Sequence, residues 1–63
     1  MGSKLLTCYE FVEGKGGMQA KMRLAMMTGV ASAKAGSEPD SDENVAKFKA
    51  AVQEITGEAP PGV

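Results

Sequence analysis

Few side chains in this chain of 63 residues can carry chemistry. It has no histidine and a single cysteine, Cys8, without a sequence neighbour that could act as a base for the thiol. Nucleophilic and acid–base catalysis both depend on such a base. Cys8 shares an apolar face with Tyr9, so we expect it to be buried and unreactive, and a redox pairing between subunits is the alternative. The composition therefore predicts a non-enzymatic protein without a cofactor.

Acidic residues gather in the segment 40–43, where they could bind a cation or begin a helix. A calcium loop of the EF-hand type needs glycine at its sixth place and glutamate at its twelfth, but Val45 and Ala51 stand there. Short acids ahead of a helix also satisfy its free amide groups. We therefore predict no metal site, and a helix capped by Asp40 or Ser41.

Methionines form a second group of chemical interest, because Met18, Met22 and Met26 follow one another at a spacing of four, with Met27 beside them. Thioethers on successive helical turns could hold Cu(I), but no cysteine or histidine in the same helix supports such a site. Two interpretations remain. The methionines pack in the core or across an oligomer interface, or they form an adaptable apolar surface for a partner.

The segment Gly14-Lys15-Gly16-Gly17 is the first break in the apolar pattern. Three glycines in four residues give the backbone more freedom than a helix interior tolerates, which predicts a hinge. A phosphate site on the backbone amides, assisted by Lys15 and Lys21, is the alternative. The segment lacks the spacing of a nucleotide-binding loop, so the hinge is favoured.

The elements that position these residues are predicted to be helices near 4–13, 18–35 and 41–56, followed by an extended tail at 58–63. The first segment also suits a strand, although the chain offers no second strand to pair with it. The second is predicted as one continuous helix, with a break at Gly29 as the alternative. Residues 1–57 then form one small all-α domain of three helices, or of four short ones.

The third helix is the most strongly indicated, because Val45, Phe48, Val52 and Ile55 form one apolar stripe at helical spacing. Thr56-Gly57 follows as a left-handed stop. We expect Phe48 to anchor this helix. Across all three helices, the apolar residues at helical spacing make up the predicted core, namely Leu5, Tyr9, Val12, Met22, Met26, Val30, Val45, Phe48, Val52 and Ile55.

Small size makes this core marginal, because a single cysteine gives no internal disulfide and the absence of histidine removes the usual zinc ligands. We therefore expect self-association to complete the fold. The predicted function is a protein–protein interaction module or accessory subunit that binds copies of itself and a larger protein. Its candidate partner-binding residues are Met18, Met22, Met26 and Phe48.

Charge is unevenly distributed along the chain. Residues 14–35 carry a net charge of +4 without a single acid, whereas residues 36–63 carry −4. The favoured interpretation is that the two segments face one another within the fold, and the alternative is a basic patch for an external anion or acidic partner. No apolar run approaches the length of a membrane span or a secretory signal, so we expect a cytoplasmic protein that does not enter membranes.

One short stretch resembles a known motif. Leu24-Ala25-Met26-Met27-Thr28-Gly29-Val30 is similar to the Leu-Ala-x-x-Thr-Gly-Val turn of bacterial helix-turn-helix DNA-binding domains. The resemblance covers residues 24–38 and implies a DNA-binding regulator with its turn at Gly29 and a recognition helix at 31–35. The residues that would contact nucleic acid are Lys21, Arg23, Ser32 and Lys34. Few phosphate contacts are available to such a set, so DNA binding is the disfavoured alternative.

Overall fold

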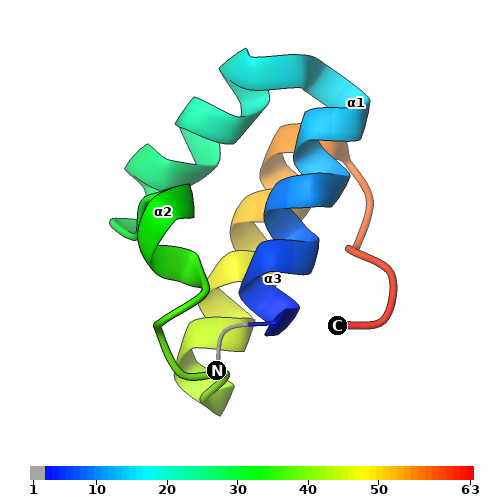
Figure 1. Cartoon of the computed structure of the whole chain (residues 1–63). Coiled ribbons are helices and arrows are strands. Elements are labelled where there is room, and N and C mark those ends of the chain that lie inside the picture. The colour runs from blue at the N-terminus through cyan, green and yellow to red at the C-terminus, as the bar shows by residue number, and fades with distance from the viewer. Residues whose placement is uncertain (1–2) are drawn as a thin grey trace.

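The computed structural model describes residues 3–63 and has three helices, α1 (Ser3–Thr28), α2 (Ser32–Ala35) and α3 (Asp42–Thr56). No strand occurs within that range, which confirms the all-α class and shows that the first segment is helical. Figure 1 shows that α1 is bent. Its first half, residues 3–16, runs beside α3, and the short α2 lies beside its second half, residues 18–28. No helix among residues 3–63 combines the length and the apolar character needed to cross a membrane.

The bend in α1 lies at Gly17, whose backbone angles (φ 70°, ψ −159°) are not helical. A side chain other than glycine is strained at this φ. The preceding Gly16 allows close approach, since a Cβ there would lie 2.7 Å from the Cβ of Ala20. The predicted hinge is therefore present, but it is confined to the end of the glycine segment, and residues 14–16 are helical.

The second predicted helix is shorter than expected, because α1 ends at Thr28 and the prediction of one continuous helix over 18–35 is wrong. Gly29 has φ 75°, and its N–H donates to the carbonyl oxygen of Ala25 at 2.9 Å. The hydroxyl of Thr28 donates to the Leu24 carbonyl at 2.8 Å and accepts the N–H of Val30 at 3.2 Å. These local bonds stop the helix despite the strong helix propensity of the alanines that follow.

The third helix matches its prediction closely. The hydroxyl of Ser41 accepts the N–H of Asn44 at 3.2 Å, so Ser41 is the N-cap. Asp40, the other candidate for that position, instead accepts the Lys4 N–H at 3.3 Å and thereby serves the first turn of α1. At the other end, Gly57 has φ 79° and closes the helix as a left-handed cap.

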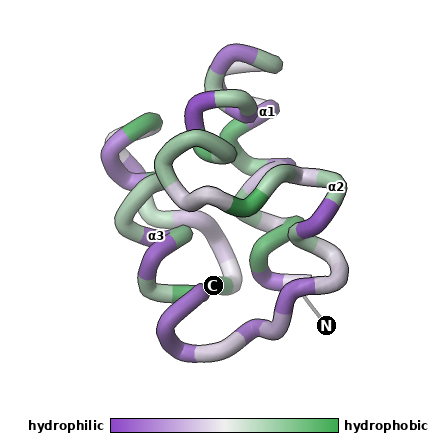
Figure 2. The backbone as a smooth tube through the Cα atoms, turned by 90° about the vertical axis from the view of Figure 1, so that its left-hand side faces the viewer, coloured by the Kyte–Doolittle hydropathy of each residue, from purple (hydrophilic) through white to green (hydrophobic). Residues whose placement is uncertain are grey.

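The core is built from two aromatic rings, aliphatic side chains and small residues, and not from the methionines. Leu5, Tyr9, Val12, Phe48 and Val52 are buried as predicted, and the remaining buried apolar residues are Cys8, Ala20, Leu24, Ala35 and Ala51. Figure 2 shows how polar and apolar residues alternate along the helices that enclose this core.

Met22 and Met26 were predicted in the core and are exposed, so that prediction is wrong. The other three predicted core residues, Val30, Val45 and Ile55, are half-buried, and Val30 and Ile55 pack against the core. The reason for the first error is that the second half of α1 is apolar on two opposite sides. Leu24 faces the core, and the methionines occupy the side turned to solvent.

The C-terminal residues were predicted to form an extended tail, and they instead turn back along the molecule, as Figure 1 shows. Pro60 is buried, Gly62 takes a positive φ of 73°, and Val63 packs against the core. The carboxylate of Glu58 lies 3.0 Å from the amine of Lys15 in α1. The tail thus belongs to the packed domain.

Candidate protein-docking surface

Met18, Met22 and Met26 form one exposed line along the second half of α1, which we call the methionine stripe. Their exposed fractions are 67%, 61% and 84%. Successive helical residues lie about 100° apart, so residues spaced by four share a face. The opposite face of the same segment is buried through Leu24 and Thr28. The stripe therefore lies on the side of the segment that is turned to solvent.

Two contacts of Tyr9 fix the orientation of this segment. Its hydroxyl donates to the carbonyl oxygen of Val30, in the turn that follows α1. Its ring meets that of Phe48 edge to face, with centroids 5.8 Å apart and an interplanar angle of 69°. Tyr9 thus ties the first half of α1 both to α3 and to the end of its own second half. With the bend at Gly17, this arrangement holds the methionine stripe outward.

A largely apolar groove of about 260 Å³ lies beside the stripe. It runs between the second half of α1 and the residues around the start of α2, and Tyr9 forms part of its wall. The full lining is Tyr9, Met18, Lys21, Met22, Ala25, Ala31 and Ser32. We call the methionine stripe and this groove together the docking surface. The groove exists because the chain turns at Gly29. A continuous helix over 18–35 would not form it, so the sequence did not predict it.

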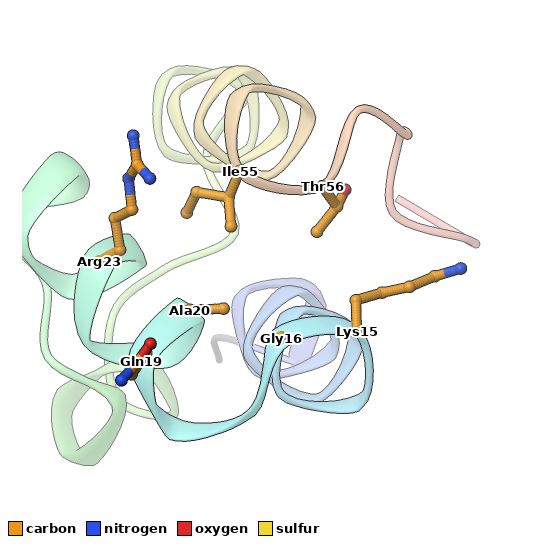
Figure 3. A pocket seen from close by; sticks show the side chains of 7 residues that line it. All are labelled: Lys15, Gly16, Gln19, Ala20, Arg23, Ile55 and Thr56. Carbon is orange, nitrogen blue, oxygen red and sulfur yellow. The ribbon is translucent and has the colours of Figure 1, made fainter.

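A second cleft, of about 480 Å³, lies on the other side of α1. In Figure 3, Ile55 and Thr56 reach into it from α3, while Lys15 extends away from Arg23. The Thr56 hydroxyl already donates to the Val52 carbonyl at 2.9 Å, so its polar group is occupied. Gln19 and the two cations, Lys15 and Arg23, make the lining of this cleft polar as well as apolar.

The phosphate alternative for the glycine segment is not supported by this geometry. Lys15, one of its two lysines, borders the cleft and pairs with Glu58. Lys21, the other, lines the docking surface, and its amine lies 3.8 Å from a carboxylate oxygen of Glu13. Of these two pairs, only Lys15 with Glu58 joins the basic segment 14–35 to the acidic segment 36–63, as was predicted for the two segments. Arg23 and Lys34 form no ion pair within residues 3–63.

The four residues named for DNA binding do not form one surface. Lys21 and Arg23 are two positions apart on a helix and so lie about 160° from each other around its axis. Lys21 and Ser32 line the groove, whereas Arg23 borders the cleft. Lys34 lies on α2, which has only four residues. The turn at Gly29 exists, but the segment after it is too short to present a recognition helix.

Phe48 was predicted as a partner-binding residue and is completely buried. Its ring fills the space between α3 and the first half of α1, next to Tyr9. Burial leaves no surface for a partner, so that assignment is corrected. The companion expectation, that Phe48 anchors α3 in the core, agrees with its position.

Cys8 is also buried, and burial raises the pKa of its thiol from 9.0 to about 11, with a smaller contribution from the nearby Asp40 carboxylate. A protonated, inaccessible thiol is a weak nucleophile. Within residues 3–63, no group of three or more histidine, cysteine, aspartate or glutamate side chains is placed to share a metal ion.

Comparisons with known proteins give no assignment: a scan against protein-family models and searches of curated proteins and of solved structures found no match.

Proposed function

We propose that the chain is a non-enzymatic interaction module that binds a larger protein through its docking surface. One observation carries this proposal. Met18, Met22 and Met26 are all more than half exposed, while the opposite side of the same helical segment closes the core. Large apolar side chains gathered on one exposed face are typical of a binding surface. Burying them against a partner would stabilise a complex without changing the fold.

The chemistry of the surface indicates what it binds. Methionine is flexible and polarisable, so the stripe can adapt its shape to an apolar helix or strand. The adjoining groove offers a place for one protruding apolar side chain. Lys21 borders that groove, in a segment of the chain that has a net positive charge. The partner proposed here is therefore an apolar helix face that carries acidic residues at its edge.

Self-association is a separate proposal about the same surface. The core does not require it, because Leu5, Val12 and Phe48 are completely buried within a single chain. A second copy would cover the methionine stripe with its own, and would bring the basic segments of the two chains together at a Coulombic cost. Sedimentation equilibrium between micromolar and millimolar concentration measures the association directly.

A DNA-binding regulator remains the second candidate, and the positive φ of Gly29 favours it, since the turn of that motif needs such a residue. Titration of a short duplex at rising salt concentration tests it. Binding to phosphates weakens steeply with salt, whereas docking of apolar surfaces does not. Retained binding of the Arg23→Gln and Lys34→Gln variants would exclude the residues assigned to that function.

Photo-crosslinking in the native source tests the docking proposal. A benzophenone amino acid replaces Met22, and the same group at Lys47, exposed on α3, is the matched control. We expect a partner to be captured from position 22 and not from position 47. The captured protein is then purified, and its affinity for the unlabelled chain is measured with Met22→Gln and Lys47→Gln. Equal affinity of both variants would overturn the proposal.

A further inference from the structure

We propose that the methionine stripe is a site of reversible oxidation by peroxide, which converts the docking surface from apolar to polar while the fold persists. The oxidation itself follows from the exposure of these side chains alone. Its effect on binding rests on the proposed function. The two parts are therefore tested separately.

The chemistry is a two-electron oxygen transfer. The thioether sulfur attacks one oxygen of hydrogen peroxide, the O–O bond breaks, an S–O bond forms, and water leaves after proton transfer. Sulfur is oxidised and the peroxide is reduced. A methionine sulfoxide reductase reverses the step with two thiols, which become a disulfide as the oxygen leaves in water. Neither direction requires a group held by this chain.

The fold separates oxidisable sulfur from the core. All four methionines within residues 3–63 belong to the second half of α1, and even Met27, the most sheltered of them, is 42% exposed. The buried core contains none of them. Its one sulfur is that of Cys8, which is completely buried. Peroxide can thus reach the stripe without entering the core.

Oxidation changes the property that docking needs. A sulfoxide is polar and chiral, and its oxygen demands a hydrogen bond that an apolar partner surface does not supply. Three sulfoxides on one face, beside the apolar groove, oppose burial of that face. Docking in turn covers the same sulfurs, so a bound partner should slow their oxidation.

The first experiment needs no partner. The purified chain is treated with hydrogen peroxide, and the oxidation of each methionine is followed by peptide mass spectrometry. We expect Met26 to react fastest and Met27 slowest, Met18 and Met22 to fall between them, and Cys8 to remain a thiol. The circular dichroism melt should stay unchanged. Loss of helicity on oxidation, or equal rates for Met26 and Met27, would overturn the proposed separation.

The second experiment uses the partner captured by crosslinking. Oxidation should weaken its affinity by about tenfold or more, and treatment with both sulfoxide reductases should restore it. A triple variant, Met18→Leu with Met22→Leu and Met26→Leu, keeps the apolar stripe but cannot be oxidised there, and its affinity should survive peroxide. If peroxide weakens that variant equally, the oxidation proposal fails while docking stands. If Met22→Gln binds normally, the docking surface is wrong, and with it the switching role.

Discussion

The second half of α1, residues 18–28, and α3 end in the same way, but they differ in where their large apolar side chains lie. At each end a threonine hydroxyl donates to the carbonyl four residues earlier, at 2.8 Å for Thr28 and 2.9 Å for Thr56. Each hydroxyl also accepts the N–H two residues later at 3.2 Å. The following glycines, Gly29 and Gly57, have φ 75° and 79°. The two stops are local structures of one kind.

The two segments differ in the side chains that they bury. On α3 the large apolar side chains face inward, with Phe48 and Val52 completely buried. On residues 18–28 the inward face carries Leu24 with the small Ala20, and the outward face carries the methionine stripe. A helix end thus depends on its own few residues, whereas burial depends on which face the rest of the fold covers. Side-chain size alone decides neither.

Among the substitutions that test this difference between the two segments, one at Phe48 should lower the stability most. Phe48→Ala leaves a cavity between α3 and α1 and should cost about 3 kcal/mol or more, a large part of the stability of a domain this small. Urea unfolding followed by circular dichroism measures the loss. Met22→Ala removes a side chain of similar reach from the exposed face and is the matched control. Equal losses in the two variants would contradict the assignment of the faces.

Next in size are the two glycine stops. Gly29→Ala and Gly57→Ala each place a Cβ in the left-handed region, so each should destabilise by about 1 to 2 kcal/mol. Gly14→Ala is the control, because Gly14 is helical with open space around it, and alanine there should stabilise by about 0.5 to 1 kcal/mol. Thermal melts decide. A gain of stability in Gly29→Ala would contradict the turn at Gly29 and support a continuous helix over 18–35.

A smaller loss of stability should appear at alkaline pH. There the thiol of Cys8 in the core loses its proton, whereas the exposed methionine sulfurs do not titrate. The folded pKa of Cys8, about 11, lies above its unfolded value of 9.0. The stability due to the protonated thiol is therefore complete below pH 9 and is lost as the pH rises through 11. At pH 9.5 the loss should be about 1 kcal/mol at most. Melts from pH 8 to 10 should show a shallower decline for Cys8→Ala.

Substitution within the methionine stripe should change the free energy of unfolding least. Met26 is 84% exposed, so Met26→Gln should change the free energy of unfolding by less than about 0.5 kcal/mol. Chemical denaturation of the isolated chain measures it. Leu24→Gln, on the opposite face of the same segment, supplies the contrast, since it buries an amide among apolar groups. If Met26→Gln proved as damaging, the stripe would be part of a core, such as an interface between copies.

Much of the fold could be predicted from local signals. The single apolar stripe of α3, a cap at Asp40 or Ser41 and the Thr56-Gly57 stop agree with one another, so that helix follows from the sequence. The stripe placed Phe48 on the apolar face, but the choice between core and docking surface needed the structure. The hinge followed from the glycines, although their number does not show that only Gly17 bends the chain. Where local signals conflict, at Thr28-Gly29 against several alanines, the hydrogen bonds of Thr28 and the positive φ of Gly29 outweigh helix propensity.

The candidate surface was predictable only in part. The spacing of Met18, Met22 and Met26 placed them on one face, but periodicity does not tell which of two apolar faces the fold will cover. Which face is covered depends on the bend at Gly17 and on the hydrogen bond from Tyr9 to Val30, and the periodicity does not reveal either of them. The groove depends further on the path of the chain after Gly29.

The bend at Gly17 also has a consequence for the speed and order of folding. The two halves of α1 meet without an intervening loop, so bringing them together costs little loop-closure entropy. Contacts close in sequence form early, and α3 must close a longer stretch of chain before it can dock. The two halves of α1 should therefore form the folding nucleus. Leu24→Ala should slow refolding, and Val52→Ala should mainly accelerate unfolding, in stopped-flow measurements.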